Sequence, residues 1–149
     1  MTNQPRVLID ADACPKRVLQ LTEKICGEFH LPFITFASYN HQFHHDNHVV
    51  VDVGSQAVDL RLANETKKGD IVVTQDIGLG AIVLGKGAKA LTPHGKIFTS
   101  DRITLDLEIR NEKARYRKGG GRTKGPAART AQDDAKFAEA LLQLVKEDL

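Results

Sequence analysis

Near the N-terminus stands the stretch Val7-Leu8-Ile9-Asp10-Ala11-Asp12-Ala13-Cys14-Pro15, in which an apolar run ends in two carboxylates and a proline. Such a run is typical of a buried strand, and Pro15 suits the first turn of a following helix. A carboxylate at the tip of a buried strand is costly unless water, a cation or a hydrogen-bond donor meets it. We therefore expect the end of this strand, at Asp10 and Asp12, to mark a functional site.

Downstream of this stretch, short apolar runs alternate with helical stripes. Further strands are expected over residues 33–37, 48–53, 70–74, 88–91 and 96–99. Helices are expected over residues 15–30, 55–68, 79–84, 100–116 and about 131–147. Alternating strands and helices imply right-handed crossovers and a mostly parallel sheet with helices on both faces. The predicted fold class is therefore α/β, a three-layer α/β/α sandwich with a mostly parallel central sheet, in one domain over residues 1–149.

The composition is that of a soluble globular protein, with 41% hydrophobic and 27% charged residues. No apolar run approaches the roughly 20 residues that span a bilayer, and the N-terminus lacks the layout of a signal peptide. The two cysteines, Cys14 and Cys26, do not make a disulfide framework, and reduced thiols are expected. These features predict a cytoplasmic protein without a membrane partner.

The net charge of +2 conceals a basic ribbon. Residues 113–129 hold seven of the 21 Lys and Arg residues and none of the 19 acids, so the rest of the chain is acidic. Three glycines interrupt the ribbon at 119–121, and we expect a mobile loop over about 117–129. A basic ribbon on an acidic body suggests a polyanionic partner. The side chains expected to hold a nucleic-acid backbone are Arg115, Arg117, Lys118, Arg122, Lys124 and Arg129.

The acidic residues are expected to meet at one edge of the sheet. Asp10 and Asp12 leave the end of the first strand, Asp76 follows the fourth strand, and Asp59 lies one turn into the helix after the third. In open α/β sheets, ligands bind beyond the carboxyl ends of the strands. Oxygen ligands without cysteine or histidine favour Mg²⁺ or Mn²⁺, which can promote in-line attack on a phosphodiester. A lone aspartate at a strand end is more often a cap or turn residue, so the argument rests on the agreement of several positions.

Some other residues have both a functional and a structural interpretation. Thr74 is either an ordinary strand residue or a group that orients water or phosphate. Ser55 is either a donor to a ligand or, more simply, a helix N-cap. For Cys14 and Cys26 we favour packing over nucleophilic chemistry, because adjacent carboxylates oppose a thiolate and Cys26 lies on an apolar helical stripe.

Four histidines fall within eight residues, at His41, His44, His45 and His48. Their spacing matches no closed tetrahedral metal site, and no cysteine joins them. A solvated polar loop is the favoured interpretation, with a metal site as the alternative.

The motifs carry a family resemblance over nearly the whole chain. They are Ile9-Asp10-Ala11-Asp12-Ala13-Cys14-Pro15, Gly69-Asp70-Ile71-Val72-Val73-Thr74-Gln75-Asp76-Ile77-Gly78-Leu79 and Gly120-Gly121-Arg122-Thr123-Lys124-Gly125-Pro126. Together they resemble the YaiI/YqxD family of bacterial proteins, which in turn is similar to PIN-like nuclease domains.

That similarity implies a PIN-like fold and a site for Mg²⁺ or Mn²⁺. Asp10, Asp59 and Asp76 match the acid after the first strand, the acid before the fourth and the acid after the fourth. Asp12 is an additional acid. The fourth acid of PIN-like domains has no clear match, and Asp101 is the nearest candidate.

Three functions remain open at this point. The first is a metal-dependent nuclease, with RNA as the substrate that the PIN-like analogy implies. The second is an aspartyl-phosphate phosphatase, because Asp10-Ala11-Asp12 resembles the Asp-x-Asp start of haloacid-dehalogenase-type enzymes. Ala13 and Cys14 depart from that pattern, and the chain offers no convincing catalytic lysine. The third is a nucleic-acid-binding protein without catalysis.

Overall fold

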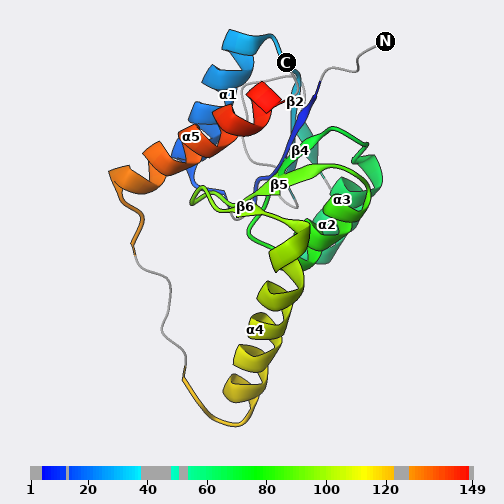
Figure 1. The fold of residues 1–149 in the computed structure, drawn as a ribbon, viewed down its shortest axis with the longest axis vertical. Coiled ribbons are helices and arrows are strands. Elements are labelled where there is room, and N and C mark those ends of the chain that lie inside the picture. Colours follow the sequence, from blue (N-terminus) through cyan, green and yellow to red (C-terminus); the bar gives the residue numbers. More distant parts are fainter. Residues whose placement is uncertain (1–4, 13, 38–47, 51–53, 123–127, 148–149) are drawn as a thin grey trace.

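The computed structural model describes residues 5–12, 14–37, 48–50, 54–122 and 128–147, with only the backbone described at 48–50 and 54–57. Figure 1 shows the arrangement of the helices and strands. In chain order these elements are β1 (Val7–Asp10), α1 (Lys16–Phe29), β2 (Phe33–Ala37), β3 (His48–Val50), α2 (Gly54–Glu65), β4 (Ile71–Val73), α3 (Ile77–Gly85), β5 (Lys89–Leu91), β6 (Ile97–Phe98), α4 (Ser100–Lys118) and α5 (Ala131–Glu147).

The strands form one sheet in the order β3-β2-β1-β4-β5-β6. Five of these six strands are parallel, and β6 pairs with β5 in the antiparallel direction. Strand β1 is central, with Ile9 paired to Thr35 of β2 on one side and to Val73 of β4 on the other. After β1 the chain adds β2 and β3 on one side of it, and then crosses to the other side to add β4, β5 and β6. The boundary between β1 and β4 is therefore the switch point at which α/β sheets form their binding crevice.

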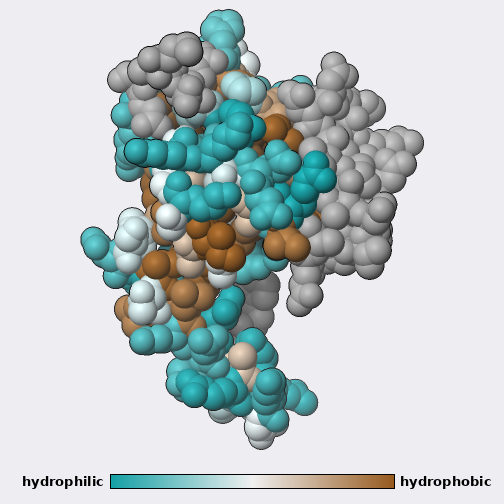
Figure 2. Space-filling view, turned by 90° about the vertical axis from the view of Figure 1, so that its right-hand side faces the viewer, coloured by the Kyte–Doolittle hydropathy of each residue, from teal (hydrophilic) through white to brown (hydrophobic). Residues whose placement is uncertain are grey.

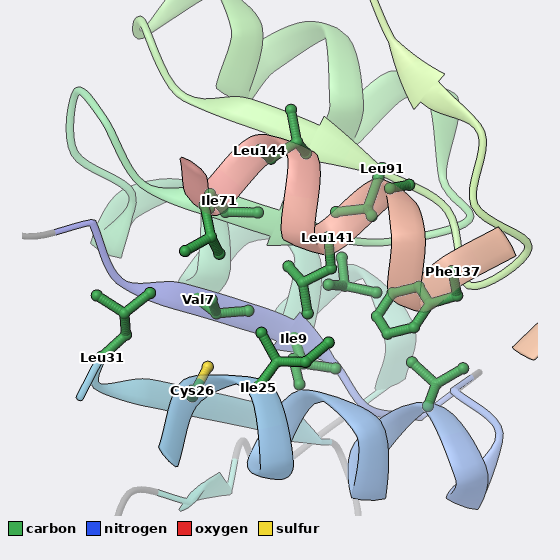
Figure 3. Close-up of a cluster of buried hydrophobic side chains, with 14 of the residues drawn as sticks. Val7, Ile9, Ile25, Cys26, Leu31, Ile71, Leu91, Phe137, Leu141 and Leu144 are labelled. Carbon is green, nitrogen blue, oxygen red and sulfur yellow. The ribbon is translucent and has the colours of Figure 1, made fainter. Parts of the chain in front are cut away.

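One face of the sheet is covered by α1 and α5. Successive side chains of a strand point to opposite faces, so alternate strand residues pack toward these two helices. Figure 3 shows Ile25 and Cys26 of α1, and Phe137 and Leu141 of α5, meeting at this face. The strand residues in this cluster are Val7, Ile9, Ala37, Ile71, Val73 and Leu91. The buried position of Cys26 agrees with its predicted role in packing.

The other face is covered by α2 and α3. Its strand residues include Leu8 and Val72, which alternate with those of the first face. Helix residues that pack on it include Val58, Leu62, Leu79 and Val83. Helices thus cover both faces of a mostly parallel sheet, which confirms the predicted three-layer α/β/α class.

The turn after β5 lies against α5. Gly95 has φ of +88°, and a Cβ atom there would lie 2.6 Å from the backbone carbonyl of Lys136. Arg129 strengthens the same junction by donating from Nη1 to the carbonyl of Pro93 at 2.8 Å. Because β5 is parallel to β4, this turn is at the carboxyl edge of the sheet, and the start of α5 is anchored there.

Helix α4 extends away from the sheet (Figure 1). Ile103 and Asp106 are buried near its start, and Lys96 pairs with Asp106 at 3.1 Å. The helix ends at Lys118, two residues beyond the expected end. The prediction of a loop from residue 117 is therefore wrong at its start, because Arg117 and Lys118 belong to the last turn of α4. Residues 123–127 of the expected loop lie outside the described part of the chain.

Candidate functional site

The carboxylates expected at the sheet edge are brought together by the fold. Asp10 ends β1, Asp76 precedes α3 across the switch point, and Asp59 extends from α2. The pKa of Asp10 is raised to about 6, mainly by burial and also by the charges of Asp12 and Asp76, while a hydrogen bond from Thr74 acts in the opposite direction. Because neighbouring charges shift a carboxyl pKa only at short range, the contributions of Asp12 and Asp76 indicate that both lie near Asp10.

Asp59 is more strongly perturbed than Asp10. Burial raises its pKa to about 7, followed in importance by a hydrogen bond with the side chain of Asp76. The charges of Asp10, Asp76 and Asp12 act in the same direction. Because all of these contributions act in one direction, the pKa of Asp59 lies well above the ordinary value of a carboxyl, as expected where neighbouring carboxylates cannot all ionise without cost.

Thr74 connects the ends of the two central strands. Its hydroxyl donates to Oδ2 of Asp10 at 3.1 Å and accepts from the backbone N–H of Asp76 at 3.0 Å. The residue is 1% exposed, so these contacts are shielded from bulk water. Thr74 therefore fixes the orientation of Asp10, which is a more specific role than that of an ordinary strand residue.

Asp76 is also the N-cap of α3. Its Oδ1 accepts from the backbone N–H groups of Gly78 and Leu79 at 2.8 and 3.3 Å. The structural interpretation of a strand-end aspartate, a helix cap, thus holds for Asp76, and its role in a metal site stays a prediction. The cap fixes one carboxylate oxygen.

The remaining predicted acids and Ser55 differ in their placement. Asp12 is half-buried and acts on both Asp10 and Asp59 through its charge. Ser55 lies inside α2, which begins at Gly54, so it is not the residue that precedes the helix. Asp101 is exposed in the first turn of α4 and is not among the charges that raise the pKa of Asp10 or Asp59.

The donor chemistry of the cluster suits a hard divalent cation, because its ligands are carboxylate and hydroxyl oxygens. Across the described ranges, no group of three or more His, Cys, Asp or Glu side chains has an arrangement that could hold a metal ion. The acids instead approach one another through the hydrogen bonds given above. A cation at this place would have to compete with the proton of Asp59, whose pKa is raised to about 7, since metal-bound carboxylates are deprotonated.

A cavity of about 400 Å³ opens beside the acids. Asp59 and Asp76 form part of its wall, and Arg110 of α4 also lines it, with Nη1 3.7 Å from Oδ1 of Asp76. The rest of the lining is mostly apolar and comes from α2 and α3, namely Leu60, Ala63, Gly78, Leu79 and Ile82. Figure 2 shows that hydrophobic side chains are exposed on this side of the molecule, above the hydrophilic lower end of α4.

The cavity was not predicted from the sequence. Leu60 of α2 is 65% exposed, whereas Val58 and Leu62 of the same helix are buried. One sequence signal could have indicated the cavity. Leu60 follows Asp59 directly, on a helix whose core contacts are made by Val58 and Leu62. Arg110 precedes the basic ribbon and carried no signal of its own.

The residues of the basic ribbon separate into two groups. Arg115, Arg117 and Lys118 lie in the last turn of α4, where Arg115 pairs with Glu112, and Arg122 is exposed just beyond. Lys124 lies outside the described residues.

Arg129 differs from the other cations. Its guanidinium pairs with Asp134 at 2.8 Å and is 19% exposed, in addition to its bond to Pro93. The geometry makes Arg129 an anchor for α5 and does not place it with the basic residues of α4.

The thiols are not reactive in this environment. Burial raises the pKa of both Cys14 and Cys26 to about 12, and the charge of Asp10 adds to the effect at Cys14. Both stay protonated near neutral pH, which agrees with the predicted packing roles. Among the clustered histidines, His48 lies in β3 and the other three lie outside the described residues.

No helix in the described part of the chain is long and apolar enough to cross a membrane. No solved structure matches the chain. Residues 8–147 match the family model described as "Uncharacterized BCR, YaiI/YqxD family".

Several bacterial relatives align over almost their full lengths. A UPF0178 protein of Heliobacterium modesticaldum is 48% identical over 142 residues, which cover 95% of this chain and 97% of the relative. A UPF0178 protein of Clostridium tetani is 40% identical, with 94% and 96% covered. One of Listeria monocytogenes serotype 4b is 39% identical, with 92% and 94% covered. The chain belongs to the YaiI/YqxD family.

Proposed function

We propose that this protein is a metal-dependent nuclease that hydrolyses phosphodiester bonds in RNA. The observation that supports it most is the meeting of Asp10, Asp59 and Asp76 at the switch point, where the charge of Asp76 contributes to the raised pKa of both Asp10 and Asp59. Carboxyls with pKa values near 6 and 7 are crowded acids at a sheet edge, which is the position of binding sites in this fold class.

The described side chains are not arranged around an ion, so in this proposal Asp10, Asp59 and Asp76 would turn to hold Mg²⁺ or Mn²⁺, which when bound supplies charge stabilisation for in-line attack on the phosphodiester. Thr74 keeps the carboxylate of Asp10 in place through its hydrogen bond. Asp12 serves as a further ligand or as the base that positions the attacking water. Because Oδ1 of Asp76 is used by the helix cap, Oδ2 is the oxygen that this residue would offer.

The basic end of α4 supplies the contacts to the substrate backbone. Arg115, Arg117, Lys118 and Arg122 are exposed at or beyond the last turn of a helix that passes the acids, and Lys124 follows in the sequence. Cations of this kind neutralise phosphates without reading bases. The choice of RNA rests on the resemblance to PIN-like nucleases, and a cytoplasmic location fits that substrate.

The test is cleavage of a fluorescently labelled RNA with Mn²⁺. Asp10→Asn should abolish cleavage and leave RNA binding intact, whereas Asp101→Asn, which changes an exposed acid of α4, should cleave as the wild type does. Wild-type protein that binds RNA but never cleaves it would contradict the proposal and favour a binding protein. A phosphorylated Asp10 trapped during hydrolysis of a phosphomonoester would instead favour the phosphatase.

A further inference from the structure

The cavity beside the acids has a composition that the cleavage chemistry alone does not require. Its lining includes two carboxylates, a guanidinium beside one of them and a mostly apolar remainder. Its volume of about 400 Å³ is within the range of roughly 300–1,000 Å³ found for small-ligand sites. Because Asp59 and Asp76 belong both to the acid cluster and to the cavity, anything that fills it lies directly next to the reacting phosphate.

The apolar part of the cavity is unusually exposed. Leu60 of α2 and Ile82 of α3 are 65% and 55% exposed, although neighbouring residues of both helices are buried in the core. The two side chains flank the cavity from adjacent helices. A flat apolar group placed between them would remove both from water, a gain of about 25 cal/mol for each Å² buried.

Arg110 supplies the polar part. Its Nη1 lies 3.7 Å from Oδ1 of Asp76, which is beyond hydrogen-bond distance, and its side chain is 46% exposed. An exposed pair of this kind contributes little to stability. Gly78 makes room for the guanidinium, since a Cβ atom there would lie 3.2 Å from Nη1 of Arg110. Arg110 can therefore turn to an incoming phosphate, whose bidentate geometry it matches.

A ligand that suits this cavity combines an anionic group, a flat apolar ring and a link to the scissile phosphate. We propose, building on the nuclease function, that the cavity receives one unpaired nucleotide next to the cleaved bond, with its base between Leu60 and Ile82 and its phosphate on Arg110. A base in such a position has left its partner strand, because stacked bases of a duplex cannot enter a side pocket. The cavity would therefore admit an unpaired nucleotide at the cleaved bond and exclude one that is still base-paired.

The experiment measures binding in EDTA, so that cleavage does not interfere. The probes are a fluorescent single-stranded oligoribonucleotide, an all-abasic strand of equal length and equal phosphate number, and the same oligoribonucleotide annealed to its complement. The wild type should bind the base-containing strand at least fivefold more tightly than the abasic strand, as one stacked base predicts, and more tightly than the duplex.

Two substitutions and two matched controls locate the effect. Ile82→Ser should remove the preference for bases, while Leu105→Ser, which changes a similarly exposed apolar residue on α4, should keep it. Arg110→Ala should weaken binding to both strands and lower the salt slope by about one phosphate, whereas Lys24→Ala on the opposite face of the sheet should not.

The outcomes separate this inference from the proposed nuclease function. An unchanged base preference in Ile82→Ser, in a protein whose wild type cleaves RNA and whose Asp10→Asn variant does not, would overturn the pocket and leave the nuclease intact. Tighter binding to the duplex than to the single strand would overturn it as well. A wild type that neither binds nor cleaves RNA would overturn both.

Discussion

Oγ1 of Thr74 donates a hydrogen bond of 3.1 Å to Oδ2 of Asp10, and this bond joins the ends of β4 and β1 across the switch point. The same oxygen accepts from the backbone N–H of Asp76. One buried hydroxyl thus connects the carboxylate of β1 with the segment that carries the second carboxylate. The relationship explains how two short strands keep their acids in fixed positions despite the charge repulsion between them.

Replacing Thr74 by Val should raise the pKa of Asp10 above its present value of about 6, because the hydrogen bond from Thr74 is the contribution that lowers it. The substitution should also cost about 1 to 2 kcal/mol of folding free energy, since the backbone N–H of Asp76 loses its acceptor. Carboxyl NMR titration and urea unfolding measure the two effects. Thr74→Ser keeps the hydroxyl and is the control. A Thr74→Val protein with an unchanged Asp10 pKa would contradict the role of the bond.

Mn²⁺ should bind more tightly as the pH rises from about 5 to 8, because Asp10 and Asp59 must lose protons with pKa values of about 6 and 7. Calorimetry at pH 7 in two buffers of different ionisation enthalpy should show proton release. In Asp59→Asn, fewer protons should be released on Mn²⁺ binding. The pH at which the Mn²⁺ affinity changes most steeply should move down toward 6. An affinity that does not depend on pH over this range would mean that the cation binds elsewhere.

The acid cluster should destabilise the fold at high pH. The folded-state pKa of Asp59 is about 7, above its ordinary value of 3.8, so the folded protein binds more protons than the unfolded chain between these values. Stability should therefore fall as the pH rises through 7. Asp59→Asn should raise the Tm by a few degrees at pH 8 and have a smaller effect at pH 5. Equal effects at both pH values would show that the carboxylate is not strained by its neighbours.

Arg129 and Arg122 should behave differently although both are cations of the same basic ribbon. Arg129→Ala should cost about 2 kcal/mol by removing the bonds to Asp134 and Pro93, with little change in RNA affinity. Arg122→Ala should leave stability unchanged and reduce the salt slope of RNA binding. Thermal unfolding and anisotropy titrations at several salt concentrations measure both. A larger salt effect in Arg129→Ala than in Arg122→Ala would reverse the assignment.

The sheet was predictable because its signals are local. The strands Val7–Asp10 and Ile71–Val73 are short apolar runs with an acid at or just after their ends. The rule that ligands bind at the carboxyl edge of the sheet then predicts that Asp10 and Asp76 lie together.

Two predicted helix ends differed in accuracy. The helix ending near His30 agrees with the structure, whereas α4 continues through Arg117 and Lys118 because these residues tolerate helix well.

The contacts between elements were not predictable in the same way. Nothing in the pattern around Arg110 indicates that its guanidinium reaches Asp76, because the approach depends on how α4 crosses α3. The charge of Arg129 suggested a contact with nucleic acid, but its partners, Asp134 and Pro93, lie on a helix and a turn whose packing a single sequence does not specify. Similarly, the exposure of Leu60 depends on the packed orientation of α2, which a single sequence does not specify.

The most direct measurement of the central claim is the anomalous scattering of a crystal soaked with Mn²⁺ near pH 8, where Asp10 and Asp59 are ionised. We expect one strong peak within ligand distance of the carboxylates of Asp10 and Asp76, with Asp59 turned toward it, and no such peak in Asp10→Asn. A peak found only at the histidines between 41 and 48, with none at the acids, would contradict the account.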